Sequence, residues 1–433
     1  MSQYRAYPAY KDSGIEWIGQ VPEHWKVARV KRLVSLRNER RNDVSTDTIY
    51  IGLEDVEAGS GQYKPTNGSS RQSDDSTVGI FYEGDVLYGK LRPYLRKAII
   101  SEMAGCCSTE FLVLRAEKTE PRWLQEWLLT PDVTHQIESG CEGAKMPRAD
   151  WGHIGSIEVA YPDQPEQAQI LTTLDRETAR IDALIQKKTR FIELLKEKRQ
   201  ALITHAVTKG LDPNAKMKDS GIEWIGQVPE HWKIAQIKRI SALNPRKSTL
   251  NEEKDSLCTF LPMEKLRTNA VTLDETRPIH EVYGGYSYFC DGDILIAKVT
   301  PCFENGNIAV ANGLVNGIGF GSTEINVLRV NGKGHNRFLY YRLQEEQFRT
   351  IAKSEMRGTG GLKRVPTELF ESFAIGLPDT DEQATIAATL DRETARIDAL
   401  IGKAEQSITL LKERRAAFIT AAVTGQIDLR GKQ

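Results

Sequence analysis

One sixteen-residue segment occurs twice in this chain without a single change. "KDSGIEWIGQVPEHWK" occupies residues 11–26 and returns at residues 218–233. A second segment, "TLDRETARIDALI", occupies residues 173–185 and again 389–401. Because the order is the same in both halves, the 433 residues are a tandem duplication of a unit of about 210 residues. This period is far longer than that of a solenoid repeat, so the sequence predicts two domains of one fold.

Between the identical segments, the two halves share only a pattern of apolar residues and glycines. The aligned stretches are "GDVLYGKLRPYLRKA" with "GDILIAKVTPCFENG" (84–98 and 292–306) and "STEFLVLR" with "STEINVLR" (108–115 and 322–329). Short β-branched and aromatic runs bounded by turn residues predict strands. An apolar face predicts a helix at residues 120–130 and another at 335–344. We therefore expect two related α+β domains of about 140 residues whose divergence indicates different tasks.

Each half ends in a long helix with heptad periodicity. The first is predicted from Leu171 to about Val207, and most a and d positions are apolar in both copies. Two near-identical helices of this kind are expected to pair in a coiled coil about 55 Å long, at 1.5 Å per residue. The predicted seam contains Leu174, Ile181, Ile185, Ile192 and Leu195 in the first helix and Leu390, Ile397, Ile401, Ile408 and Leu411 in the second.

Two arrangements of these helices remain open: they pair with each other, or each lies along its own domain. If the ligand is a DNA duplex lying along the coil, the helices must be antiparallel, because the dyads of DNA lie across its axis. The alternative is that each helix lies along its own domain, with Leu184 and Phe191 widening its apolar stripe.

Composition excludes several classes of protein. No apolar run approaches the roughly 20 residues that span a membrane, and the N-terminus has no apolar signal core, so we expect a cytoplasmic protein. The six cysteines form no C-x-x-C and do not combine with histidines at metal-ligand spacing, so no metal site is expected. A net charge of −1 means that nucleic-acid binding would need local basic patches or a basic partner.

The repeated motifs resemble those of the specificity subunit of a Type I restriction–modification enzyme. The residues that carry this resemblance are "SGIEWIGQVPEHW", "GDVL" and "GDIL" with a following lysine, the "EQ" that opens each long helix, and "LDRETARIDALI". The resemblance spans about residues 11–428. It implies two target recognition domains, each reading half of a split DNA site, and an antiparallel coiled coil between them. The corresponding segments are 1–164, 165–210, 211–380 and 381–433: first domain, first helix, second domain, second helix and tail.

The resemblance also implies partners and cofactors. Double-stranded DNA is the ligand, two methyltransferase subunits dock on the repeated segments, and restriction subunits join the full complex. S-adenosylmethionine belongs to the methyltransferase, ATP and Mg²⁺ belong to the restriction subunit, and this chain itself catalyses nothing. Two identical partners would explain why the segments that they contact stay identical. Trp17, Trp25, Trp224 and Trp232 are candidate anchors for them, with packing in the local core as an equal alternative.

Basic residues in two stretches of each middle are candidate DNA contacts. Arginine and lysine suit guanine edges and phosphates, and Gly-rich turns allow a backbone to approach a ligand closely. The candidates are Lys90, Arg92, Arg96, Lys97, Lys145 and Arg148 in the first half and Lys298, Lys363 and Arg364 in the second. For any one of them, a solvated surface charge is the competing interpretation.

Two other functions are alternatives for a chain with this sequence. An autonomous methyltransferase or nuclease is disfavoured because the sequence has no G-x-G-x-x-G in a strand–helix context and no P-loop. "NPRK" at 244–247 begins like an amino-methyltransferase motif but lacks its second proline and its aromatic residue. A duplicated scaffold that binds only proteins would fit the neutral charge and the long helices.

Overall fold

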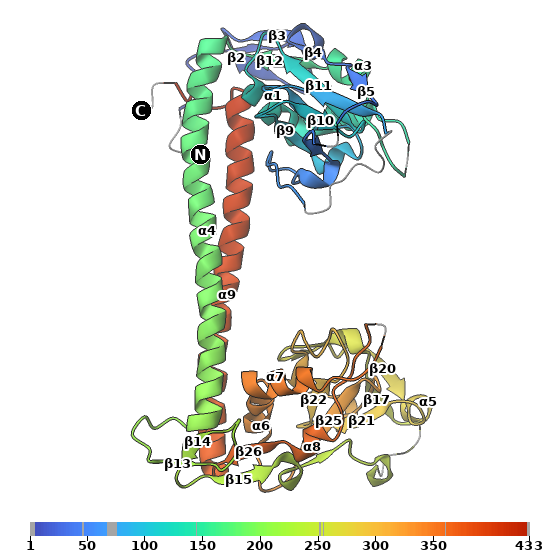
Figure 1. Cartoon of the computed structure of the whole chain (residues 1–433), viewed down its shortest axis with the longest axis vertical. Helices are drawn as coiled ribbons and strands as arrows, with labels where there is room; N and C mark the ends of the chain where they lie inside the picture. Colours follow the sequence, from blue (N-terminus) through green and yellow to red (C-terminus); the bar gives the residue numbers. More distant parts are fainter. Residues whose placement is uncertain are drawn as a thin grey trace. The chain divides into compact units, whose positions relative to one another are not determined.

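The computed structural model describes residues 5–45, 47–66, 76–143, 145–250, 253, 255–359 and 361–430, and it divides into two compact units (Figure 1). The first unit comprises residues 1–189 and 405–433, and the second comprises residues 190–404. The long helices are α4 (Gln164–Lys209) and α9 (Thr380–Val423), so each unit contains a part of both.

The domain of the first unit is built on two four-stranded sheets. Their strand orders are β4–β11–β8–β9 and β5–β7–β10–β6. The strands of these sheets are β4 (Val34–Leu36), β11 (Phe111–Ala116), β8 (Val86–Gly89), β9 (Ala98–Ile100), β5 (Arg40–Arg41), β7 (Val78–Phe81), β10 (Gly105–Cys107) and β6 (Tyr50–Ile51). The remaining elements of the domain are the antiparallel pairs β1 (Tyr10–Asp12) with β2 (Gln20–Pro22) and β3 (Lys26–Arg29) with β12 (Glu158–Tyr161), and the helices α1 (Pro121–Leu128), α2 (Pro131–Ser139) and α3 (Trp151–Ser156).

The domain of the second unit repeats this plan. Its sheets are β16–β25–β22–β23 and β20–β17–β24–β21. The strands of these sheets are β16 (Ser241–Leu243), β25 (Ile325–Val330), β22 (Ile294–Ala297), β23 (Ile308–Val310), β20 (Thr276–Pro278), β17 (Leu257–Leu261), β24 (Ile318–Gly321) and β21 (Ser287–Cys290). The remaining elements are the pairs β13 (Met217–Asp219) with β14 (Gln227–Pro229), β15 (Lys233–Gln236) with β26 (Ala374–Leu377) and β18 (Leu266–Arg267) with β19 (Ala270–Val271), and the helices α5 (Ile279–Val282), α6 (Asn336–Arg342), α7 (Glu346–Ser354) and α8 (Leu369–Ser372).

The two domains differ at one sheet edge. In both, three strands of the second sheet correspond, including a parallel pair, β6 with β10 in the first domain and β17 with β24 in the second. The fourth strand is added at opposite edges: β5 pairs with β7, whereas β20 pairs with β17. The two domains therefore share one α+β fold, as predicted, and they differ at the edge of the second sheet.

Alternation along the central strands builds two apolar layers in each domain. Val86 and Tyr88 of β8 point into a core with α1 and α2, whereas Leu87 between them packs on the other sheet. Ile294 and Leu295 of β22 divide in the same way. Successive side chains of a strand face opposite sides, so a strand buried on both sides must be apolar throughout. This is why "DVLY" and "DILI" are continuous apolar runs.

The two long helices run antiparallel in each unit considered by itself. In the first unit, Thr173 donates to the carbonyl of Leu429, and Asp182 pairs with Arg415 at 2.9 Å. In the second unit, Arg199 pairs with Asp398 at 3.0 Å, and Ile203 and Val207 further along α4 share a buried cluster with Ile386 and Leu390, which come earlier in α9. Residue numbers thus rise along α4 as they fall along α9, and every predicted seam residue is buried or half-buried. The predicted fold class, two α+β domains with an antiparallel coiled coil, is confirmed.

One expectation about the helices is wrong. Leu184 and Phe191 do not widen a buried stripe, because both side chains are exposed. Leu400, which repeats Leu184 in the second helix, is exposed as well. Among the described residues, no helix combines the length and the apolar character needed to cross a membrane.

Candidate nucleic-acid interface

The repeated Glu–Gln pair at the start of each long helix makes hydrogen bonds that join three parts of a unit: the long helix, the repeated sixteen-residue segment and a helix of the domain. Glu166 accepts hydrogen bonds from the Tyr7 hydroxyl (3.0 Å) and from Nε1 of Trp25 (3.2 Å), and Nε2 of His24 lies 2.7 Å from its other oxygen. Burial, with the nearby Glu166 carboxylate, raises the pKa of Tyr7 far above its usual range. We call Glu166 with these three partners the first junction.

The second junction is simpler. Glu382 accepts from Nε1 of Trp232 (3.1 Å), and Nε2 of His231 lies 2.7 Å from it. The neighbouring glutamines complete these connections: Gln167 accepts from the backbone N–H of Glu120 at the start of α1, and Gln383 accepts from the backbone N–H of His335 at the start of α6. In each unit the repeated Glu–Gln pair thus connects the repeated sixteen-residue segment and a domain helix to the first turn of a long helix.

These junctions correct the expectation that Trp25 and Trp232 anchor a partner. Both side chains are fully buried, and their rings pack edge to face on Trp123 and Phe338. A large aromatic without accessible surface offers nothing to another subunit. Trp224 is exposed and Trp17 is half-buried, so only these two stay predictions as anchors.

The structure brings the two basic stretches of the first domain together. A hairpin closed between Glu142 and Arg148 pairs with the chain that follows β8, because the backbone N–H of Arg92 donates to Pro147 and that of Ala149 donates to Lys90, both at 2.8 Å. Lys145 is exposed on this hairpin. We call the chain from Glu142 to Arg148 the first hairpin.

The second domain builds the same feature from its own residues. The second hairpin is closed between Arg357 and Arg364 and pairs with the chain that follows β22: the backbone N–H of Val365 donates to Lys298 and that of Thr300 donates to Lys363. Lys363 is exposed. Both predicted clusters therefore meet in each domain, although their middles share few letters.

A glutamate that the sequence reasoning missed fixes the base of each hairpin. Arg148 makes a bidentate ion pair with Glu110 (3.2 Å to each oxygen), and Arg364 makes one with Glu324 (2.7 Å at the closest). Hydrogen bonding to Arg364 lowers the pKa of Glu324. Both arginines are therefore paired within the chain while about half of each side chain stays exposed. The signal was the "STE" repeated at 108–110 and 322–324, a charge kept in one of the short segments that the two middles share.

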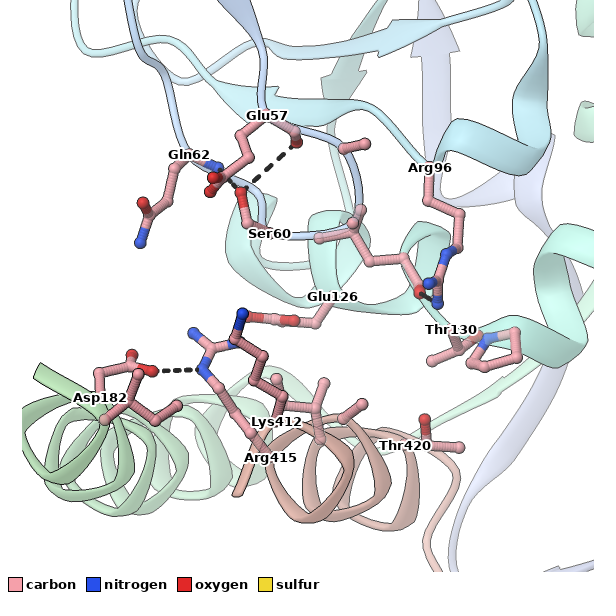
Figure 2. Close-up of a pocket in the computed structure, with 17 residues that line it drawn as sticks. Glu57, Ser60, Gln62, Arg96, Glu126, Thr130, Asp182, Lys412, Arg415 and Thr420 are labelled. Atoms are coloured by element: carbon pink, nitrogen blue, oxygen red, sulfur yellow. Dashed lines mark hydrogen bonds and ion pairs between the residues drawn. The ribbon is translucent and has the colours of Figure 1, made fainter. Parts of the chain in front are cut away.

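Two predicted contacts lie away from the hairpin. The guanidinium of Arg96 donates to the carbonyl of Leu129, and Nζ of Lys97 donates to the carbonyl of Leu53 at 2.6 Å. Arg96 lines a cavity of about 440 Å³ that is also bordered by Glu126 and by the long helices (Figure 2). Both cations are thus hydrogen-bonded within the domain, and their contact with DNA stays a prediction.

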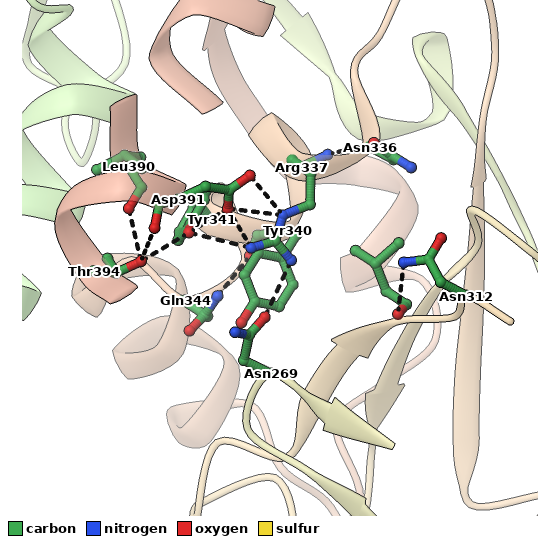
Figure 3. A network of polar contacts seen from close by, with 11 residues as sticks. Asn269, Asn312, Asn336, Arg337, Tyr340, Tyr341, Gln344, Leu390, Asp391 and Thr394 are labelled. Atoms are coloured by element: carbon green, nitrogen blue, oxygen red, sulfur yellow. Dashed lines mark hydrogen bonds and ion pairs between the residues drawn. The ribbon is translucent and has the colours of Figure 1, made fainter. Parts of the chain in front are cut away.

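The attachment of each domain helix to a long helix differs between the units. In the second unit, Arg337 of α6 donates to Asp391 of α9, Tyr341 donates to the same carboxylate at 2.6 Å, and the Arg337 guanidinium stacks on Tyr340 (Figure 3). In the first unit the corresponding Arg122 turns to Glu126 at 2.6 Å and lies 3.6 Å from Asp175. Burial raises the pKa of Glu126, and Arg122 opposes that shift.

The residues that the structure describes contain no group of three or more His, Cys, Asp or Glu side chains placed to hold a metal ion. What the geometry presents is a paired scaffold: two α+β domains of one topology, each with an exposed cationic hairpin, attached to a common pair of helices.

Comparison with known proteins shows what this chain is similar to. Residues 229–410 match the family described as Type I restriction modification DNA specificity domain. The EcoEI specificity subunit of Escherichia coli is 31% identical over 199 residues, which cover 46% of this chain and 33% of that protein. The EcoAI specificity subunit of the same organism is 35% identical over 188 residues, 43% of this chain and 31% of that protein. The aligned part is thus about a third of the length of these relatives.

A solved chain from a type I R-M system shares the fold at a TM-score of 0.71, with 18% identity, over 94% of this chain and 99% of that one. The fold and the repeated junctions define a duplicated two-domain scaffold on paired helices. In sequence this chain is similar to Type I restriction–modification specificity subunits over residues 229–410 and over the segments aligned to the EcoEI and EcoAI subunits.

Proposed function

We propose that this chain recognises DNA sequence for a Type I restriction–modification complex and catalyses nothing itself. Each α+β domain reads one half of a bipartite site through its hairpin. The observation that carries this proposal is the twice-built hairpin: the same glutamate–arginine pair closes a hairpin that carries an exposed lysine, Lys145 or Lys363, in two domains whose other residues have diverged. A shared grip on phosphate with different surrounding side chains is what two half-sites require.

The exposed face of the repeated helix segment is the proposed docking surface for partners. Residues 173–185 and 389–401 are identical, and each presents an exposed leucine, Leu184 or Leu400, which an isolated helix pair does not need. In the first unit, Leu184 borders a hollow of about 190 Å³ with Leu411 and Phe418. Two methyltransferase subunits carrying S-adenosylmethionine would find one such surface each. Restriction subunits, which use ATP and Mg²⁺, would join through them.

Genome-wide mapping of adenine methylation tests the proposal. Deleting this gene should abolish methylation at one split motif and leave other methylation unchanged. The same motif, carried on a duplex, should bind the full chain with its methyltransferase more tightly than a scrambled duplex does. An unchanged methylation map in a strain that expresses the partner methyltransferase would refute the proposal, and retained binding to a protein ligand alone would favour the scaffold alternative.

The hairpin lysines give a graded prediction. Lys145→Ala and Lys363→Ala should each weaken binding to specific and scrambled duplexes alike, because a phosphate contact carries no sequence information. Each should also reduce the slope of log affinity against log salt concentration by about 1, the release of one counterion. Titrations at several salt concentrations measure both quantities.

Lys118→Ala, which removes an exposed lysine beyond the end of β11, is the matched control and should leave the slope unchanged. A loss confined to the specific duplex would instead assign base reading to the hairpin lysines.

A further inference from the structure

Each hairpin carries a large apolar side chain that nothing in the unit covers. Met146 is 46% exposed and Leu362 is 56% exposed. Both stand two residues before the arginine that closes the hairpin, Arg148 or Arg364. The two domains therefore present an aliphatic group at equivalent positions, although neighbouring residues of the hairpins differ.

The backbone beneath each of these side chains is anchored. In the first hairpin, the N–H of Arg148 donates to the carbonyl of Glu142, and the Arg148 guanidinium is held by Glu110. In the second, the Thr300 hydroxyl donates to the carbonyl of Gly361 at 2.7 Å and accepts from the N–H of Lys363 at 2.9 Å. These bonds hold residues next to the exposed aliphatic group in place, so the group stands beside an anchored part of the backbone.

The charge around these side chains selects the kind of ligand. Met146 lies between Lys145 and Arg148, and Leu362 directly precedes Lys363 and Arg364. An aliphatic group set among cations does not suit the apolar core of another protein. It suits a surface that combines dense negative charge with small apolar features, which describes a groove of duplex DNA.

The chemistry of the base edges decides which groove. Phosphates line both grooves, but only the major groove carries an apolar group on its base edges. The apolar feature on the base edges of the major groove is the C5 methyl group of thymine. Building on the proposed function, we propose that Met146 and Leu362 are specificity-determining residues, each contacting a thymine methyl group in its own half-site.

Deleting the methyl group from DNA and the side chain from the protein should have non-additive effects. With the full chain, its methyltransferase and the methylated motif as duplex, each thymine is replaced in turn by deoxyuridine, which removes only the methyl group. One replacement per half-site should weaken wild-type binding roughly fourfold, the loss expected for one buried methyl-sized group. Met146→Ala should weaken binding to the thymine duplex by at least this factor and should be insensitive to uracil at that position.

Leu362→Ala should do the same in the other half-site only. Met103→Ala and Leu257→Ala, which remove exposed side chains elsewhere in the same units, are the matched controls and should leave thymine discrimination intact. Thermal melts should be unchanged for all four variants, because each of these side chains is exposed.

The possible failures are distinguishable. A wild-type complex that does not prefer the motif over a scrambled duplex overturns the proposed function and this inference together. A wild-type complex that prefers the motif but treats uracil as thymine everywhere, or whose uracil penalty survives in Met146→Ala, overturns the inference alone. A duplex with 2-aminopurine, a fluorescent base analogue, in the half-site gives a further test. If the wild-type complex raises its fluorescence and Met146→Ala does not, the side chain inserts between bases, and this result would also overturn the inference.

Discussion

Glu166→Ala should destabilise the first unit by about 3–5 kcal/mol, the range for removing one member of a buried charged network. The Glu166 side chain is only 8% exposed. Its removal leaves the Tyr7 hydroxyl and Nε1 of Trp25 without their acceptor, and each buried unsatisfied donor costs about 1–3 kcal/mol. Urea unfolding of the full chain, with hydrogen exchange resolved over β1, β2 and β3, measures the loss and locates it.

The duplication supplies the control for this prediction. Glu382→Ala removes the equivalent glutamate, but the Glu382 side chain is 27% exposed, and within the described part of the chain its partners are His231 and Trp232 alone. Water can replace part of what is lost, so we expect about 1–2 kcal/mol. Glu23→Ala, an exposed acid of the same repeated segment, should stay within about 0.5 kcal/mol. Equal losses for Glu166→Ala and Glu382→Ala would show that the buried network of the first junction contributes no extra stability.

The duplicated architecture was predictable because it depends on periodicity. Heptad spacing places Leu174 and Leu390 on the buried seam whatever the partner is, and two-residue alternation makes β8 and β22 recognisable as strands buried on both faces. Such patterns are local consequences of helix and strand geometry. The predicted helices at residues 120–130 and 335–344 are likewise confirmed as α1 and α6.

The contents of the sites were predictable only in part, because side-chain partners are set by tertiary distance. Nothing local to "PEHW" reveals that Trp25 faces Trp123 and Glu166, so an aromatic of the core resembled an interface anchor. Arg148 and Arg364 are exposed cations, as expected, but nothing near them in the sequence reveals that Glu110 and Glu324 lie opposite them. In both cases the clue was a charged residue repeated in both halves, Glu166 with Glu382 and Glu110 with Glu324, because a buried or paired charge tolerates less change than a solvated one.

A residue repeated in both halves can nevertheless contribute differently to the stability of the two units. Asp391→Ala should destabilise the second unit by about 1.5–3 kcal/mol, because this carboxylate accepts charged hydrogen bonds from Arg337 and a 2.6 Å bond from Tyr341. Asp175→Ala should cost less than about 0.5 kcal/mol, since Asp175 is 60% exposed and its Arg122 partner lies 3.6 Å away. Urea unfolding with hydrogen exchange over α1 and α6 measures both.

The same pair of variants separates domain positioning from general stability. If the Asp391 contact orients the second domain on α9, then Asp391→Ala should weaken recognition of that domain's half-site at every base position, whereas Asp175→Ala should leave the other half-site unaffected.

Tyr341→Phe removes only the hydroxyl and should give a smaller loss of the same kind, because Arg337 keeps its partner. A destabilised Asp391→Ala protein with unchanged discrimination would limit this contact to stability. Equal losses in the two aspartate variants would mean that exposure and distance do not govern the strength of these ion pairs.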